Sequence, residues 1–390
     1  MTYCSKCIMP FGKPDLTFDD EGVCDACRSA ERKNLIDWDA RASEFIKLVA
    51  KYKAIAEELG SPYDCIIPVS GGKDSTFQTL VCLEYGLKPL LVSFEPTMAT
   101  ELGKKNLKNN NAILDGCDLI QFRKNPHPYR KMARIAFETV GDHDWINHVG
   151  IFTVPVHFAI TYKVPLLIWG ENCQEEYGGP NEEARRTQEL DANWLQEFGG
   201  LLGLRVQDMI DDHGFDKRDL SPYIYPEEED LLLYGIKTQY KITGLYLGSF
   251  FKWDAFNQVK EIKQHGWRDK ENPVTGTYRT YENLDCELVS FHDYLKYVKF
   301  GFCRTTDHAC IDIRNGRLTR DEAIDLARKF DGRYPLRHEA AFCSYLGMNK
   351  DEVRKVIDSF TNTEIFETYE DGSFMRQTDG VSLIKKEPVR

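Results

Sequence analysis

The 390-residue sequence has little that would place it in a membrane. Its apolar runs, such as residues 164–169, are far shorter than the roughly 20 residues that a membrane-spanning helix needs. The first residues include charges and cysteines where a signal peptide would have a smooth apolar core. We therefore expect a cytoplasmic protein that makes no membrane contact.

The chain also lacks an excess of positive charge. It has 50 lysines and arginines against 62 aspartates and glutamates, which gives a net charge of −12. A protein that binds nucleic acid would need a local basic patch to overcome this field. The pairs Lys104-Lys105 and Arg185-Arg186 are small and are typical of solvated helix faces. Nucleic acid is therefore not an expected partner.

Twelve cysteines in such a chain indicate metal or thiol chemistry rather than disulfides. Cys4 and Cys7 form one Cys-x-x-Cys pair, and Cys24 and Cys27 form a second. Four thiolates at this spacing predict a closed, structural Zn²⁺ site, whose metal would also supply folding energy to a short polar segment. A redox dithiol or an iron-sulfur cluster is the alternative. A redox or metal role stays open for four later cysteines, namely Cys117, Cys173, Cys303 and Cys310.

Residues 63–75 predict a strand, a glycine turn and the start of a helix that runs to about residue 85. The turn lacks the glycine and the four-residue spacer of the common phosphate loop. Gly71 and Gly72 have no Cβ, so consecutive backbone N–H groups can point into one concavity. Together with the positive end of the following helix, this concavity predicts an anion site.

The turn carries further groups that suit an anion. Lys73 adds a full charge, and Ser70 and Ser75 add hydroxyl donors. The sequence Ser-Gly-Gly-Lys-Asp-Ser, with Asp74 as its acid, resembles the PP-loop of the ATP pyrophosphatases. That family splits ATP between the α and β phosphates, so the resemblance implies that the turn holds pyrophosphate. A glycine-rich turn with a solvated Lys-Asp pair is the alternative.

Three more apolar strands follow, with stretches long enough for helices between them. They are residues 88–96, 118–122 and 164–169. A further helix is predicted before the first strand, within residues 35–59, where apolar residues recur at helical spacing. Short strands alternating with helices indicate an α/β fold with a doubly wound parallel sheet. The PP-loop resemblance implies the same fold.

Ligands of such sheets bind at the carboxyl ends of the strands. The glycine turn, Ser93-Phe94 and Gly170-Glu171 all fall at the carboxyl ends of predicted strands, so we predict that they share an ATP site. Asp74 and Glu171 are candidate Mg²⁺ ligands, and backbone groups near residues 92–94 are placed to contact adenine. For Glu171 a helix-capping or surface role is the alternative.

Less specific patterns describe the rest of the chain. The turn-rich residues 171–181 predict a loop at the edge of the crevice, and Arg185 and Arg186 beyond it could clamp a phosphate. The aromatic residues 244–256 predict either core or a stacking wall for a sugar or base. The expected domains are a zinc-binding knuckle (1–34), a PP-loop ATP pyrophosphatase domain (35–222) and a mostly helical C-terminal region (223–390) that completes the substrate site.

Four motifs extend the resemblance over nearly the whole chain. They are the cysteine pairs, the glycine turn, Trp169-Gly-Glu-Asn172 with Tyr177-Gly-Gly, and Lys299-Phe-Gly-Phe-Cys-Arg-Thr-Thr-Asp-His308. With them the chain resembles the N-acetyl sugar amidotransferases, which make acetamidino sugars for bacterial O-antigens and nonulosonic acids. The resemblance implies that ATP adenylylates the oxygen of an N-acetyl group on a nucleotide-linked sugar, and that ammonia then displaces AMP. It also implies a separate glutaminase partner that supplies the ammonia.

The resemblance further implies roles for single residues. Lys73 and Asp74 would be catalytic, and the turn from Ser70 to Ser75 would bind ATP. The residues expected on the substrate side are Glu171, Asn172, Tyr177, Arg185, Arg186, Arg304, Asp307 and His308.

Two other functions compete with this interpretation. A tRNA sulfurtransferase can combine a PP-loop with an N-terminal zinc module, but the acidic charge and the absence of a Cys-x-x-Cys pair after Cys27 disfavour it. A non-enzymatic binding scaffold is disfavoured by the intact turn. The sequence leaves open the sugar, the glutaminase and the oligomeric state, a homo-oligomer included.

Overall fold

The computed structural model describes residues 2–113, 116–171, 176, 189–190, 202–236, 238–387 and 389. Several residues that the sequence analysis selected lie outside this set, namely Asn172, Cys173, Tyr177, Arg185 and Arg186. Their predicted roles stay predictions.

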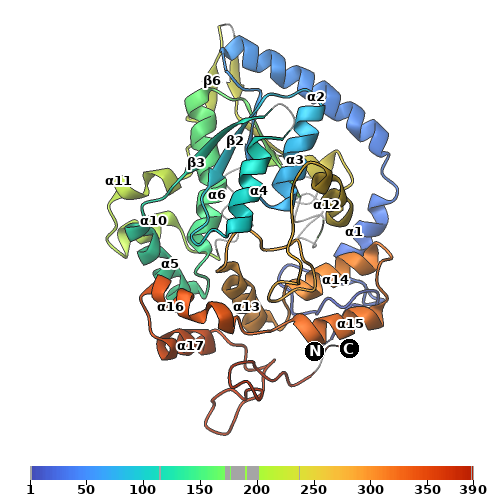
Figure 1. The fold of residues 1–390 in the computed structure, drawn as a ribbon, viewed down its shortest axis with the longest axis vertical. Helices are drawn as coiled ribbons and strands as arrows, with labels where there is room; N and C mark the ends of the chain where they lie inside the picture. The colour runs from blue at the N-terminus through green and yellow to red at the C-terminus, as the bar shows by residue number, and fades with distance from the viewer. Residues whose placement is uncertain are drawn as a thin grey trace.

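A six-stranded sheet forms the centre of the molecule (Figure 1), in the order β3-β2-β1-β4-β8-β5. The first five of these strands are parallel neighbours, and β5 pairs antiparallel with β8. The strands are β1 (Cys65–Pro68), β2 (Pro89–Phe94), β3 (Asp118–Phe122), β4 (Leu166–Trp169), β5 (Glu189–Leu190) and β8 (Thr243–Tyr246). Because β2 lies on one side of β1 and β4 on the other, the strand order reverses at β1. This confirms the predicted α/β fold with a doubly wound parallel sheet.

Helices cover both faces of the sheet. In Figure 1, α3 and α4 lie in front of the strands and α6 lies behind them. The helices of the first half are α1 (Asp25–Lys33), α2 (Trp38–Leu59), α3 (Lys73–Glu84), α4 (Glu101–Asn111), α5 (Pro126–Val140) and α6 (Trp145–Tyr162). Helix α2 begins where Asp37 accepts a hydrogen bond from the Ala40 N–H, at 3.0 Å, and ends at Gly60. Its predicted place, ahead of the first strand, is confirmed.

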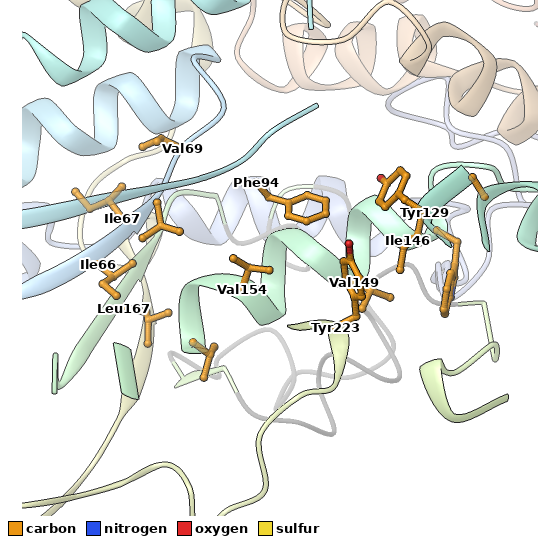
Figure 2. Close-up of a cluster of buried hydrophobic side chains, with 14 of the residues drawn as sticks. Ile66, Ile67, Val69, Phe94, Tyr129, Ile146, Val149, Val154, Leu167 and Tyr223 are labelled. Carbon is orange, nitrogen blue, oxygen red and sulfur yellow. The ribbon is translucent and has the colours of Figure 1, made fainter. Parts of the chain in front are cut away.

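Part of the hydrophobic core lies between the sheet and α6 (Figure 2). Ile66 and Ile67 of β1 are completely buried, as expected for a central parallel strand with helices on both faces. The ring of Phe94 packs against α6 at Gly150, where a Cβ would lie 2.4 Å from the ring. The aromatic residues 244–256 also belong largely to the core, since Phe250 is 1% exposed. The core interpretation of that segment is therefore favoured over a stacking wall.

The second half of the chain is mostly helical, as predicted. Its helices are α10 (Val206–Asp211), α11 (Lys217–Leu220), α12 (Ala255–Gln264), α13 (Val289–Phe300), α14 (Arg304–Arg314), α15 (Arg320–Phe330), α16 (Glu339–Leu346) and α17 (Lys350–Ser359). It also contains the hairpin of β6 (Leu232–Tyr234) with β7 (Gln239–Lys241), and the 3-10 turns η1 (Ser221–Tyr223), η2 (Leu247–Ser249) and η3 (Leu336–His338).

Strand β8 lies beyond the predicted domain boundary at residue 222 and still pairs with β4 in the main sheet. The two ends of the chain lie near α15 (Figure 1). Among the helices of the described residues, none is both long and apolar enough to cross a membrane.

Candidate functional site

The glycine turn follows β1 and leads directly into α3. Gly71 has a φ of +84°, and a Cβ there would lie 2.6 Å from the carbonyl oxygen of Gly103 and 2.8 Å from the backbone nitrogen of Leu107. The indole Nε1 of Trp267 donates to the Gly71 carbonyl at 3.0 Å. Because both the φ angle and the close approach of α4 exclude a side chain, glycine is required at this position.

The turn presents the N-terminal end of α3 to the carboxyl edge of the sheet. Gly72 is the N-cap residue, and its N–H donates to Ser70 Oγ at 3.3 Å. The hydroxyls of Ser75 and Thr76 donate back to the Gly72 carbonyl, at 3.3 and 2.9 Å. The first N–H groups of a helix have no partner within the helix, so this end can bind an anion.

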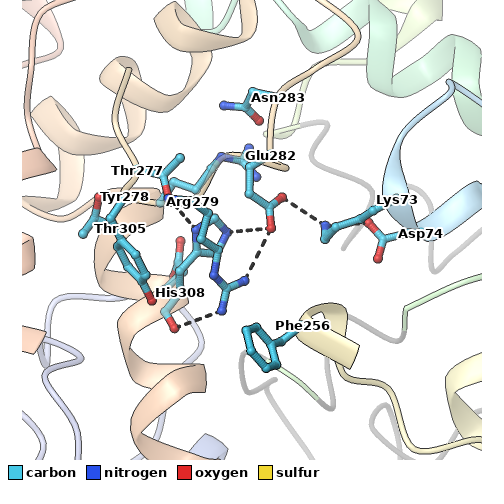
Figure 3. A network of polar contacts seen from close by, with 12 residues as sticks. Lys73, Asp74, Phe256, Thr277, Tyr278, Arg279, Glu282, Asn283, Thr305 and His308 are labelled. Atoms are coloured by element: carbon cyan, nitrogen blue, oxygen red, sulfur yellow. Dashed lines mark hydrogen bonds and ion pairs between the residues drawn. The ribbon is translucent and has the colours of Figure 1, made fainter. Parts of the chain in front are cut away.

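Lys73 is the cation of the turn (Figure 3). Its Nζ lies 2.8 Å from Asp74 Oδ2 and 3.0 Å from Glu282 Oε2, and its side chain is 13% exposed. Burial opposes the charge, but the two carboxylates outweigh it and raise the pKa of Lys73. The ammonium is therefore held in its charged form at the start of α3.

Glu282 connects Lys73 to a buried polar network (Figure 3). His308 Nε2 lies 3.5 Å from Glu282 Oε1, and Thr277 Oγ1 lies 2.8 Å from the other ring nitrogen of His308. Arg279 donates to Glu282 at 3.4 Å and to Asp312 at 3.0 Å. Burial and the neighbouring cations hold the pKa of His308 well below its usual range, so this histidine is neutral.

Ser93 and Phe94 lie at the carboxyl end of β2, and Gly170 and Glu171 directly follow β4. The side chains of Ser93 and Phe94 are buried, so any contact with ATP would use their backbone. Gly170 has a packing role, because a Cβ there would lie 2.9 Å from the Trp253 ring. Burial and the nearby charges of Asp74 and Glu176 raise the pKa of Glu171 to about 8.

The three candidates of α14 divide into two groups. Arg304 forms three hydrogen bonds of 2.9 to 3.0 Å with Asp293, which ties α14 to α13. Asp307 pairs with Lys296 of α13. The structure therefore gives Arg304 and Asp307 partners within the C-terminal region, whereas it brings His308 to the Lys73 network.

The four N-terminal cysteines come together as their spacing predicted. Their sulfurs lie within 4.8 Å of one another, and the Cys24 N–H donates to Cys4 Sγ at 3.3 Å. Arg314 of α14 donates to Cys27 Sγ at 3.5 Å and lies 3.8 Å from Cys7 Sγ. Four buried sulfurs close to one another, with N–H donors around them, fit a Zn²⁺ ion, so this cluster could hold one.

The later cysteines are mostly inaccessible. Cys303 is 2% exposed and its Sγ donates to the Asp293 carbonyl at 3.1 Å, and Cys310 is completely buried. Cys117 is partly exposed.

Comparison with known protein families bears on the C-terminal region. Residues 275–379 match the family model of the LPS biosynthesis protein WbpG-like, C-terminal domain. This match supports a role in lipopolysaccharide biosynthesis, and the family suggests an enzyme. A comparison with curated proteins finds no significant match. The matched segment includes Glu282 and His308, so it contributes directly to the Lys73 network.

Three residues of the polar network around Lys73 were not selected from the sequence. Glu282, Arg279 and Asp312 lie in no recognised motif, and more than 200 positions separate Glu282 from Lys73. For Arg279 and Glu282 the sequence offers one signal, the density of charged and aromatic residues in 278–287, and Asp312 lies outside that segment.

Proposed function

We propose that this chain is an ATP-dependent amidotransferase that converts an N-acetyl group of a nucleotide-linked sugar to an acetamidino group, with ammonia from a partner glutaminase. One observation carries the proposal. The ion pair between Lys73 and Glu282 joins the PP-loop-like turn to the segment that matches a lipopolysaccharide biosynthesis family. In this proposal the turn splits the nucleotide, and the segment that matches the lipopolysaccharide biosynthesis family contributes Glu282 to the same site.

In this reaction the turn would bind the pyrophosphate that leaves ATP. The N-terminal N–H groups of α3 would donate to its oxygens, and Lys73 would neutralise part of its charge. For Lys73 to do so, its ammonium would exchange Asp74 or Glu282 for a phosphate oxygen. Asp74 and Glu171 would hold Mg²⁺ at this edge, with Glu171 giving up its proton to the solvent, and the ion would supply positive charge to the phosphates.

An amide carbonyl is a poor electrophile, and attachment of AMP converts its oxygen into a leaving group. The chain must therefore position two substrates and exclude water rather than supply a covalent nucleophile. The buried state of Cys303 and Cys310 agrees with this, because a sulfur-transfer enzyme would need an accessible thiol. Cys303 and Cys310 are therefore unsuited to sulfur transfer, whereas Cys117 is partly exposed.

The test is an assay of AMP and pyrophosphate release by the purified chain with ATP, Mg²⁺ and ammonium. The substrates are UDP- and CMP-linked N-acetyl sugars, their deacetylated forms as controls, and bulk tRNA. We expect release that depends on one acetamido sugar, with a product one mass unit lighter because oxygen becomes NH. Glutamine should not replace ammonium unless a glutaminase is added. Release that depends on tRNA instead would refute the proposal.

A further inference from the structure

A second cluster of metal-ligating side chains lies away from the cysteines, between α6 and α13. Asp144, His148 and His292 place one ligand atom each within 4.8 Å of one another, and Asp144 is buried. The two imidazole rings meet edge to face with their centroids 5.1 Å apart. None of these residues was selected from the sequence, because Asp144 and His148 are separated from His292 by more than 140 positions.

Asp144 is the N-cap residue of α6, but its side chain does not cap the helix. An aspartate at this position usually accepts a hydrogen bond from the N–H two or three residues later. Here Asp144 Oδ2 instead accepts a 3.3 Å hydrogen bond from Asn147 Nδ2 and lies 4.0 Å from His148 Nε2, one helical turn along the same face. The carboxylate therefore lies beside His148.

His292 is oriented by a second carboxylate. Its Nδ1 lies 2.9 Å from Asp142 Oδ1, and Asp142 is 4% exposed and also accepts the Asp144 N–H at 3.0 Å. With Nδ1–H donating to Asp142, the lone pair of Nε2 is available to a metal. A carboxylate behind the imidazole is the usual arrangement of a metal-ligating histidine.

His148 completes the set. One of its ring nitrogens, Nδ1, is buried and has no hydrogen-bond partner among the described residues. Its other nitrogen, Nε2, is the one that faces Asp144, so a metal held by both residues would bind Nε2 and leave Nδ1 to a water molecule.

We propose that Asp144, His148 and His292 bind a divalent first-row transition metal ion, Zn²⁺ foremost, with Asp142 as the residue that orients His292. Two imidazoles and a carboxylate suit such an ion, whereas Mg²⁺ and Ca²⁺ prefer oxygen ligands alone. Bond lengths of about 2.0 to 2.2 Å require ligand atoms about 3 to 4 Å apart, which small side-chain rotations supply. Three protein ligands leave a position for water or substrate, unlike the closed cysteine cluster.

The place of this cluster connects it to the turn. His292 precedes Asp293, which holds Arg304 and accepts a 2.6 Å hydrogen bond from Asn283, the neighbour of Glu282. A metal at His292 would therefore hold the first turn of α13 in place. Through Asp293 and Asn283, that turn adjoins Glu282, the carboxylate that pairs with Lys73. The proposal does not depend on the amidotransferase reaction.

The test is a Co²⁺ titration of the metal-depleted, reduced full-length chain, followed by absorption spectroscopy. We expect two equivalents to bind. One should give the intense sulfur-to-cobalt band of the cysteine cluster, and the other should add only weak visible bands. The double variant His148→Ala/His292→Ala should bind one equivalent with the sulfur band unchanged, whereas Asp142→Asn should bind the second equivalent about 10- to 100-fold more weakly.

His157→Ala is the matched control, since His157 lies on the same helix and contacts the Ile224 carbonyl. It should bind two equivalents. A wild-type chain that binds one equivalent, all of it in the sulfur band, would overturn the proposal, as would a double variant that retains two. If the double variant does not fold, the milder Asp144→Asn is titrated instead, and two tight equivalents in that variant would refute the site.

Discussion

The cysteine cluster and the Lys73 network are two buried polar regions built in opposite ways. All four sulfurs of the cluster belong to residues 4–27, and they lie within 4.8 Å of one another. The network joins Lys73 to Glu282 and His308, which are distant in the sequence. The first is therefore encoded in local spacing, whereas the second exists only after the chain has folded.

Both regions depend on α14, although at different points of the helix. His308, near its start, reaches Glu282, and Arg314, at its end, donates to the cysteine sulfurs. In Figure 1 helix α14 lies beside α1, which carries the last cysteine of the cluster. We expect damage to the cluster to disturb the whole N-terminal segment, and damage to the network to act mainly on the turn.

The largest effect is expected from the variant Cys4→Ser. Structural zinc contributes on the order of 10 kcal/mol to the folding of small zinc domains, so loss of one sulfur should release the metal and lower the unfolding temperature. Zinc content and thermal unfolding measure this. The control is Cys343→Ser, which changes a buried cysteine outside the cluster. This variant should keep the zinc of the cluster. Retention of zinc by Cys4→Ser would contradict the assignment.

The second-largest effect is expected from a substitution in the glycine turn. Lys73→Ala should lower AMP release about 10²- to 10³-fold, because removal of one charge-stabilising donor costs about 3 to 4 kcal/mol. Zinc content should not change, since Lys73 lies in the other region. Lys104→Ala, an exposed lysine of α4 paired with Glu101, should leave the rate unchanged. Equal losses in both variants would show that the turn has no special role.

The network itself is tested by Glu282→Gln. Glu282 is 5% exposed and faces Lys73 and Arg279, and loss of one partner of a buried ion pair costs about 3 kcal/mol. Urea unfolding should show this decrease in the free energy of unfolding. Glu228→Gln, which removes an exposed pair with Lys241, should cause no measurable change. A stable Glu282→Gln protein would mean that water reaches this network.

A smaller effect is expected where the cluster meets α14. Arg314→Met removes the donor to the cysteine sulfurs and should weaken zinc binding about 10- to 100-fold. Competition with a chelator measures the affinity. Arg134→Met, which removes a surface pair with Glu138, should bind zinc like the wild type. An unchanged affinity in Arg314→Met would show that the sulfurs need no cation beside them.

The smallest effect is expected at Lys124, a half-buried lysine that can be compared with Lys73. Lys73 has carboxylate partners, whereas the ammonium of Lys124 contacts the Glu95 carbonyl and the Tyr129 ring, beside a cavity of about 510 Å³. Burial lowers the pKa of Lys124 to about 8. Acylation at Lys124, followed by mass spectrometry, should reach half its maximal rate near pH 8. The same peptide in urea should require about pH 10.4.

The pKa of Lys124 also sets the sign of its contribution to stability. Because its folded pKa lies below the unfolded value, the contribution is full above about pH 10.4 and decreases as the pH falls towards 8. A Lys124→Met variant should lose this dependence. Equal midpoints of acylation in the folded and urea-unfolded protein would show that the amine is hydrated.

The sequence by itself determined the parts that depend on near neighbours. The spacing of Cys4 to Cys27 determined the sulfur cluster, and the run from Cys65 through Gly72 determined the strand and the turn. Capping boxes at Thr319 and Asn349, each with a glutamate three residues later, start α15 and α17. Periodicity, glycine and capping residues act within a few positions, so these features can be read without the fold.

Only the tertiary structure decided what surrounds the turn. The charged and aromatic segment 278–287 does not show that Glu282 is buried or that it faces Lys73, and Glu282 acquires Lys73, Arg279 and His308 as partners only in the folded chain. The same packing turned Arg304 and Asp307 towards α13 and brought His292 to His148. Charge pairs and metal ligands depend on distances of a few ångströms in space, and only folding sets such distances between residues far apart in the sequence.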